Sequence, residues 1–234
     1  MKNIVAIILA RGNSKGIPQK NIINFCGKPL LVWSIQQAKN TKKISSVWVS
    51  SDNKKILNIS EKNGANIIVR PNSLSTDTSS SESGWLHAIN SIEKNSKPID
   101  LVIALQPTSP IREVSDIENG IRSFYKSNYD SMFSASYIGD FFIWQKNHYN
   151  NFQSINYNYK KRPRRQEFQK QYVENGSFYI FKPNILRKYN NRFGGKIGIT
   201  LMEFWKTFEI NDKKDLELCK VIMNHYILKN KAKL

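Results

Sequence analysis

A loop with three cations and two glycines follows the first apolar run of the chain. It reads Leu9-Ala10-Arg11-Gly12-Asn13-Ser14-Lys15-Gly16-Ile17-Pro18-Gln19-Lys20-Asn21. Glycine lets backbone N–H groups approach an anion closely, and arginine and lysine neutralise phosphate charge. The G-x-x-x-x-G-K-[ST] string of a Walker A loop is absent. An ordinary surface turn does not need three spaced cations, so we interpret this segment as a phosphate-binding loop.

A second polar segment is rich in hydroxyl side chains. It reads Arg70-Pro71-Asn72-Ser73-Leu74-Ser75-Thr76-Asp77-Thr78-Ser79-Ser80-Ser81. It follows an expected strand and opens an expected helix, so Arg70 and the hydroxyls can read a nucleobase edge or its ribose, and the helix N-terminus can face phosphates. A structural alternative stays open, because Ser79-x-x-Glu82 forms a capping box and Asp77 or Thr78 can also cap a helix.

A third segment, Leu105-Gln106-Pro107-Thr108-Ser109-Pro110-Ile111-Arg112, ends a buried run. A Gln-Pro pair at the carboxyl edge of a parallel sheet lies where ligands bind in such folds. The alternative is a turn that the prolines stiffen.

A basic string follows later, as Lys160-Lys161-Arg162-Pro163-Arg164-Arg165-Gln166, and Glu174-Asn175-Gly176-Ser177-Phe178-Tyr179 comes after it. By charge alone the string over 161–166 can be a nuclear-targeting or nucleic-acid patch. Alternatively, its arginines can grip a carboxylate and phosphates through bidentate contacts.

An acidic segment, Phe208-Glu209-Ile210-Asn211-Asp212-Lys213-Lys214-Asp215, precedes the last helical pattern. Carboxylates that leave a short strand suit a magnesium ion, whereas Asn211 or Asp212 can equally cap the following helix. The histidines, His87, His148 and His225, lie outside all five segments. We therefore expect neither histidine acid–base catalysis nor a His-rich metal site.

These polar segments lie between strands and helices that alternate along the chain. Strands are expected at 4–10, 47–49, 65–70 and 101–106, and helices from Pro29 and over 53–63, 79–95 and 114–127. This order predicts an α/β fold, in which helices cover both faces of a mainly parallel sheet in a three-layer α/β/α arrangement. Its loops at the carboxyl edge would carry the polar segments.

The region from Tyr137 to Asn175 breaks the alternation, since it is aromatic, basic and without a clear period. We interpret residues 137–175 as an insertion, a lid or an oligomer arm within a single domain that spans 1–234. Regular structure is expected again at 176–181, 197–202 and 207–210. A C-terminal helix would place Leu216, Cys219, Met223 and Tyr226 on one face, followed by a frayed basic tail over 229–234.

Composition narrows the classes of function. The 234 residues carry a formal charge of +18, with lysines spread along the whole chain, so we hold nucleic-acid binding to be a minor alternative to an anionic small substrate. Two cysteines make no disulfide framework, and no apolar run is long enough for a membrane span. We expect a cytoplasmic protein without a secretory signal.

Taken together, the segments resemble the acylneuraminate cytidylyltransferases, or CMP-sialic acid synthetases. The first loop is similar to the family's A-R-x-x-S-K-G-(I/L)-x-x-K-N signature. An R-P pair with a hydroxyl-rich helix start, Q-x-T-S-P, R-P-R-R-Q, N-G-S-F-Y and an acidic string follow in the family's order. The resemblance runs from Ile4 to about Leu218, and it implies a Rossmann-like nucleotidyltransferase fold whose extension joins a homodimer partner.

The resemblance implies that CTP and a nonulosonic acid, N-acetylneuraminate first of all, give the CMP-sugar and pyrophosphate with Mg²⁺ as the ion. It assigns the triphosphate to Arg11, Ser14, Lys15, Lys20 and Asn21. It assigns the cytidine to Arg70, Ser79, Ser81 and Gln106. Arg164, Arg165, Gln166 and Tyr179 would meet the sugar, and Arg11, Lys20, Arg164 and Arg165 would serve catalysis.

Two departures from the family pattern concern the metal and the sugar. The family's Asp-Ile-Asp reads Glu209-Ile210-Asn211 here, and the neutral Asn211 holds Mg²⁺ more weakly than an aspartate. Val173 stands where some bacterial members carry an arginine. Three alternatives therefore stay open. The first is the same reaction on legionaminate, pseudaminate or another α-keto acid sugar, and the second is another nucleotidyltransferase, such as the Kdo-activating enzyme, although R-P-R-R-Q and N-G-S-F-Y argue against it. The third is a non-catalytic nucleotide- or nucleic-acid-binding protein.

Overall fold

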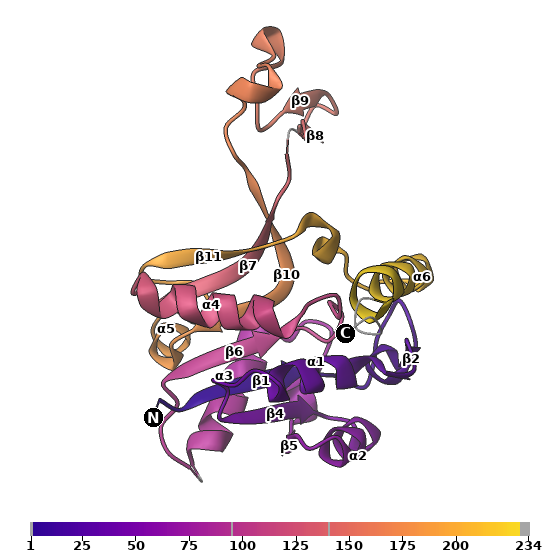
Figure 1. Ribbon diagram of the computed structural model, residues 1–234, viewed down its shortest axis with the longest axis vertical. Helices are drawn as coiled ribbons and strands as arrows, with labels where there is room; N and C mark the ends of the chain where they lie inside the picture. Colours follow the sequence, from indigo (N-terminus) through magenta and orange to yellow (C-terminus); the bar gives the residue numbers. More distant parts are fainter. Residues whose placement is uncertain (1, 95, 140, 230–234) are drawn as a thin grey trace.

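One mixed sheet of seven strands organises the chain (Figure 1). The computed structural model describes residues 2–94, 96–139 and 141–229. The strand order is β11-β7-β10-β6-β1-β4-β5. Only β10 runs antiparallel to its neighbours, β6 and β7, and the remaining pairs are parallel. The strands are β1 (Ile4–Leu9), β4 (Ser46–Ser51), β5 (Asn66–Val69), β6 (Leu101–Leu105), β7 (Ser131–Tyr137), β10 (Tyr172–Phe181) and β11 (Ile197–Met202).

Helices pack on both faces of this sheet. Alternate residues of β1 enter two separate clusters, with Ile4, Ala6 and Ile8 facing one layer and Val5 and Ile7 the other. The first layer holds α1 (Leu30–Lys39), α2 (Lys54–Lys62) and α4 (Val114–Lys126). The second holds α3 (Ser81–Glu93) and α5 (Pro183–Tyr189). The predicted three-layer α/β/α class with a mainly parallel sheet is confirmed.

A third cluster lies under the C-terminal helix, where α6 (Lys213–Ile222) packs on the start of α1 and on the hairpin β2 (Asn24–Phe25) and β3 (Lys28–Pro29). Cys219 and Met223 are buried there as expected, but Tyr226 is 44% exposed and Ile227 is 3% exposed. The chain switches to a π-helix at 223–228, and its wider turn brings residue 227 to the buried face. Of the expected tail, residues 230–234 lie outside the described part.

Several expected boundaries are wrong. Strand β7 was not anticipated, because its serines hide the apolar alternation. Inside the sheet the hydroxyl of Ser134 is satisfied by hydrogen bonds with Asn175 and with the backbone of Phe178. The strand expected over 207–210 is absent, and a short 3-10 helix, η5 (Phe204–Thr207), precedes extended chain there. The helix expected over 79–95 begins at Ser81 and ends at Glu93, and Asn95 is not among the described residues.

The segment between β7 and β10 leaves the sheet as an arm, which we define as residues 138–171 (Figure 1). It carries the hairpin β8 (Trp144–Lys146) and β9 (Phe152–Ser154) and two 3-10 turns, η3 (Tyr159–Lys161) and η4 (Arg165–Glu167). Aromatic contacts hold it, for example Phe142 against Tyr157, with ring centroids 4.4 Å apart. Within the described ranges, no helix has the length and apolar character that a bilayer crossing requires.

Candidate functional site

A cavity of about 560 Å³ opens at the carboxyl ends of β1 and β6. Its lining comes from the loop after β1, the segment between β5 and α3 with the first turns of α3, the loop after β6, and Asn211. All nine residues expected to bind the nucleotide lie on this lining: Arg11, Ser14, Lys15, Lys20, Asn21, Arg70, Ser79, Ser81 and Gln106. Segments almost 100 residues apart in sequence therefore meet at one edge of the sheet.

Two of the three cations of the first loop, Arg11 and Lys15, share the carboxylate of Asp77, a residue considered from the sequence only as a helix cap. Arg11 Nη1 lies 2.9 Å from Asp77 Oδ1, and Lys15 Nζ lies 3.1 Å from Asp77 Oδ2. Arg11 also donates to the carbonyl of Thr76 over 3.2 Å. The hydrogen bond from Lys15 is the main cause that lowers the pKa of Asp77, so this carboxyl is ionised at neutral pH.

Backbone contacts fix the shape of this loop. The Asn21 amide donates to the Arg11 carbonyl over 2.9 Å, and the Gly12 N–H donates to Asp52 Oδ1 over 2.9 Å. A Cβ on Gly16 would stand 2.1 Å from the carbonyl oxygen of Asn211. Glycine is required at position 16 because a side chain there would collide with the main chain of Asn211. The absence of a side chain would also let an anion approach the loop closely.

Lys20 points from the loop toward the acidic segment. Its Nζ donates to the carbonyl of Ile210 over 2.8 Å. Partial burial lowers the pKa of Lys20, an effect that the nearby Glu209 opposes and Arg11 reinforces. The ammonium is thus held at the cavity by a neutral main-chain acceptor, and the carboxylates of Glu209 and Asp215 both oppose the lowering of its pKa.

The second segment supplies the wall on the α3 side. Arg70 is only 5% exposed, its Nε donates to Ser75 Oγ over 2.9 Å, and burial lowers its pKa. The cap of α3 is Ser80, whose Oγ accepts from the Ser83 N–H, so the capping box expected at Ser79 is wrong. Ser79 instead contacts Thr76 Oγ1 at 2.7 Å and remains on the cavity lining.

The loop that carries Gln106 is held by a buried arginine, Arg112, whose role was not expected from the sequence. Arg112 donates from Nε to Gln37 Oε1 over 2.8 Å, from Nη1 to the carbonyl and hydroxyl of Ser177, and from Nη2 to Ser34 Oγ and the Gln106 carbonyl. Full burial lowers its pKa, but all five N–H groups have acceptors. The local sequence gives little sign of this role, because Arg112 ends a loop that also carries the polar Gln106, Thr108 and Ser109.

The acidic segment is split between two roles. Asp212 caps α6, and its Oδ1 accepts from the N–H groups of Lys214 and Asp215, as the capping alternative predicted. Asn211 lines the cavity, while Glu209 lies beside it as the acceptor of a 3.0 Å hydrogen bond from Asn211 Nδ2. The described residues contain no group of three or more His, Cys, Asp or Glu able to hold a metal.

Magnesium usually binds one or two carboxylates and completes its shell with water and substrate phosphates. The pair Glu209 and Asn211 fits that pattern, because one carboxylate and one amide oxygen stand at the cavity's edge beside Lys20. These two side chains are too few to surround a magnesium ion by themselves, so any ion there must also bind substrate oxygens.

The expected sugar residues do not meet at this cavity. The arm carries these residues around η4, namely Arg164, Arg165 and Gln166, and there the Arg164 N–H donates to Glu167 Oε2. The residues that line the cavity all fall between positions 9 and 108, apart from Asn211, so none of them belongs to the arm. Figure 1 shows the arm leaving the sheet at β7 and β10 and ending beyond it. All three lie within residues 137–175, the region that the sequence sets apart from the strand–helix alternation.

Tyr179 is buried in β10 behind a wall of the cavity. Its hydroxyl donates to Glu174 Oε1 over 2.6 Å, and burial together with this contact raises its pKa. Its ring packs 5.9 Å from Trp85, which lines the cavity. The guanidinium of Arg192 lies 4.4 Å from the Tyr179 ring, a neighbour that the sequence analysis also missed.

The model of the cytidylyltransferase family matches residues 5–233, and the chain belongs to this family. It is 35% identical to N-acylneuraminate cytidylyltransferase A of Danio rerio over 80% of this chain and 43% of that one. It is 29% identical to a pseudaminic acid cytidylyltransferase of Campylobacter jejuni over 96% of this chain and 98% of that one. The chain therefore spans less than half of the fish relative's length and nearly all of the bacterial relative's.

Solved structures share the fold at low sequence identity. A CMP:2-keto-3-deoxy-manno-octonic acid synthetase complexed with CTP aligns over 97% of this chain and 100% of that chain, with a TM-score of 0.72 and 18% identity. A 4-diphosphocytidyl-2C-methyl-D-erythritol synthase from Anaerococcus prevotii aligns over 96% of this chain and 99% of its own, with a TM-score of 0.69.

Proposed function

We propose that this chain transfers the cytidylyl group of CTP to the anomeric hydroxyl of a nonulosonic acid and releases pyrophosphate. The carrying observation is the cavity at the carboxyl edge of the sheet, where all nine expected nucleotide residues come together. Membership of the cytidylyltransferase family supports the nucleotide, and the names of the Danio and Campylobacter relatives support the acceptor.

The phosphates would lie along the loop after β1, in contact with Arg11, Ser14, Lys15, Lys20 and Asn21. The sugar oxygen attacks the α-phosphorus, and the bond to the β-phosphate oxygen breaks, so negative charge grows on the departing pyrophosphate. Fixed cations stabilise such charge without reorganisation during the reaction. Arg11 and Lys15 would exchange Asp77 for phosphate oxygens when the nucleotide binds.

The cytidine would lie against the opposite wall. Arg70, Ser79 and Ser81 present donors and acceptors there, and Gln106 closes the floor. Ser75 holds the Arg70 guanidinium, and Arg112 holds the main-chain carbonyl of Gln106, so the Arg70 side chain and the Gln106 backbone are in place before any ligand arrives. Preorganised polar groups of this kind favour one base over others, because a mismatched base leaves them unpaired.

Magnesium is the ion we propose for this reaction. Glu209 and Asn211 would hold it together with phosphate oxygens, and when bound it would add positive charge next to the phosphates. The exposed carboxylate of Glu209 already accepts from Asn211, so the two side chains point to one another at the cavity's edge.

The sugar end requires a second copy of the chain. Arg164, Arg165 and Gln166 lie on the arm and away from the cavity of their own chain, so we propose a homodimer in which each arm reaches the partner's cavity. Arginine matches a sugar carboxylate by bidentate hydrogen bonds. Tyr179, behind Trp85, would shape the pocket for the sugar's tail without direct exposure.

The names of the relatives support two acceptors, while legionaminate and other α-keto acid sugars stay open. N-Acetylneuraminate is supported by the 35% identity to the Danio relative, and pseudaminate by the relative that matches 96% of this chain. We place the protein in the cytoplasm, as its cysteine usage indicates, with both cysteines free. The charge of +18 keeps nucleic-acid binding as a rival that predicts salt-sensitive oligonucleotide affinity.

Pyrophosphate release tests the proposal. CTP, MgCl₂ and a panel containing N-acetylneuraminate, legionaminate, pseudaminate and Kdo would be supplied, with UTP and ATP in place of CTP as controls. We expect release with CTP and one or two nonulosonic acids only. Folded protein that binds CTP and releases no pyrophosphate with any sugar would contradict catalysis and favour a binding protein.

A further inference from the structure

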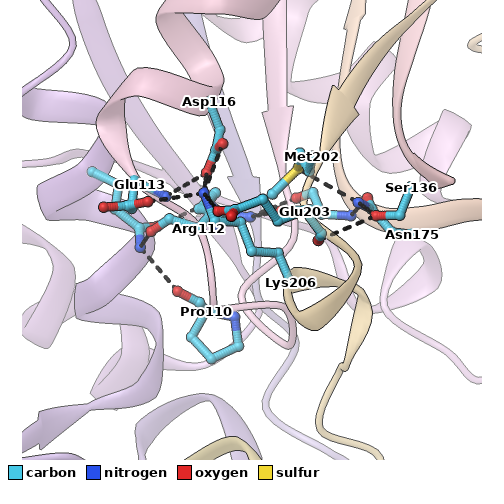
Figure 2. Close-up of polar contacts among 11 residues, drawn as sticks. Pro110, Arg112, Glu113, Asp116, Ser136, Asn175, Met202, Glu203 and Lys206 are labelled. Atoms are coloured by element: carbon cyan, nitrogen blue, oxygen red, sulfur yellow. Dashed lines mark hydrogen bonds and ion pairs between the residues drawn. The ribbon is translucent and has the colours of Figure 1, made fainter. Parts of the chain in front are cut away.

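A lysine with almost no exposed surface lies next to the acidic segment, outside the cavity lining. Lys206 is 3% exposed, and its Nζ lies 2.9 Å from both carboxylate oxygens of Asp116, 2.9 Å from Glu113 Oε2 and 3.6 Å from Glu203 Oε2 (Figure 2). A buried ammonium is costly to desolvate and is tolerated only with such partners. An apolar residue would fill this position without that cost.

The partners of Lys206 belong to the start of α4. Asp116 is 8% exposed, and its Oδ2 also accepts from the Glu113 N–H over 2.7 Å, which completes the cap of α4. Burial raises the pKa of Asp116, against the opposing hydrogen bonds from Glu113 and Lys206. The ion pair therefore ties η5 firmly to a helix that packs on the main sheet.

Four residues further along, the main chain of Ile210 joins two walls of the cavity. Its N–H donates to the Thr108 carbonyl over 2.8 Å, and its carbonyl accepts from Lys20 Nζ over 2.8 Å. Thr108 and Lys20 both line the cavity, and Glu209 and Asn211 flank Ile210. The acceptor that holds the Lys20 ammonium is thus part of a short segment between Lys206 and α6.

We propose that Lys206 is a positioning residue for the phosphate end of the cavity. Its ion pair anchors the segment 207–211, which we name the rim segment, and the rim segment in turn places the Ile210 carbonyl that orients Lys20. The inference rests on the proposed function only in naming phosphate as the ligand at Lys20. Lys206 itself touches neither cavity nor substrate.

The structure gives a specific expectation for two ligands. In the proposed function the β- and γ-phosphates of CTP would extend along the loop to Lys20, whereas CMP lacks these phosphates. Loss of the Lys206 anchor should weaken CTP by about tenfold, which corresponds to one misplaced hydrogen bond to a charged group, and should leave CMP within about twofold of wild type. A role in overall stability alone would leave both affinities unchanged in folded protein.

The experiment measures CTP and CMP affinity by calorimetry in one MgCl₂ buffer. Lys206→Met alone leaves Asp116 buried without its cation, so the principal variant is Lys206→Met with Asp116→Asn, which removes both charges. Glu113→Gln is a milder variant that keeps the lysine and the carboxylates of Asp116 and Glu203, with an expected loss of about threefold for CTP alone. Lys182→Met, which breaks a half-exposed pair with Asp130, is the matched control and should change neither affinity.

Each outcome decides between roles. A raised ratio of the CTP to the CMP dissociation constant in the double variant or in Glu113→Gln supports positioning. Folded variants with a wild-type ratio overturn it, and so does an equal loss for both ligands. Wild-type protein that binds CTP no better than CMP and releases no pyrophosphate would instead reject the proposed function, so the two failures are distinguishable.

Discussion

The loops of the cavity and the arm are held in different ways. In the cavity, buried side chains hold the main chain of the loops, as Asn21 donates to the Arg11 carbonyl and Arg112 donates to the Gln106 carbonyl. In the arm, side chains contact their own neighbours, as Phe142 contacts Tyr157, and several of its aromatic residues are exposed. The sheet can therefore preorganise the cavity, whereas the arm depends on contacts among its own residues and on the stacking of Phe141 against Phe204.

This difference separates two kinds of functional residue. A cavity residue should act within its own chain, and its loss should not depend on a neighbour. An arm residue should act on a partner's cavity, and its loss should be repaired by an intact arm from another chain. The following predictions test that division.

The largest effect is expected at Arg11. Arg11→Ala removes a cation that, in the proposed reaction, would contact the phosphates, so turnover should fall roughly a hundred- to a thousandfold. The fold should survive, because the Arg11 side chain is partly exposed, its contacts among the described residues are with Thr76 and Asp77, and the bond from Asn21 to the Arg11 carbonyl remains in the variant. Steady-state pyrophosphate release and thermal unfolding measure both. Arg122→Ala on the exposed side of α4 is the control, and near-normal turnover of Arg11→Ala would contradict the phosphate loop.

The arm gives the next largest effect. Arg165→Ala should raise the KM for the sugar more than the KM for CTP. Co-expression of Arg165→Ala with Arg11→Ala should restore activity, because each mixed dimer has one cavity with both residues intact. Random pairing then returns roughly a quarter of wild-type activity. Activity that stays at the average of the two single variants would place Arg165 in its own chain's site.

A smaller change is expected at the metal edge. Asn211→Asp adds a carboxylate next to Glu209, and we expect half-saturation at an Mg²⁺ concentration about threefold to tenfold lower. A Mg²⁺ titration of turnover measures this, and Asp212→Asn, which alters the α6 cap, is the comparison. If the Mg²⁺ titration of Asn211→Asp matches that of the wild type, the role of this segment is to begin helix α6 and not to bind the metal.

The smallest effect concerns pH. Since partial burial lowers the pKa of Lys20, its neutral form appears at a lower pH than for an ordinary lysine, and turnover should begin to fall there on the alkaline side. Lys20→Arg keeps the charge and should move this fall upward. Lys62→Arg, on an exposed helix face, should not move it. An alkaline limb that is the same in all three proteins would rule out Lys20 as its source.

The sequence predicted those features that follow directly from a buried strand. Arg11 and Gln106 come one or two residues after apolar runs, so the parallel order of strands alone brings them to one edge. The sequence did not reveal the roles of three residues, Asp77, Arg112 and Lys206, because their partners lie far away in sequence. No local pattern identifies a carboxylate or amide that becomes a neighbour only when the chain folds. Strand β7 was missed for a related reason, since Asn175 satisfies its buried serine.

The position of β10 in the sheet has a consequence for the order of folding. It lies between β6 and β7 although it follows both in the chain, so β7 and β11 cannot join β6 until residue 181 has been synthesised. The four parallel strands up to β6 can pair earlier, and until β10 arrives β6 presents an unpaired, fully apolar edge. Nascent chains that stall before β10 would aggregate through this edge.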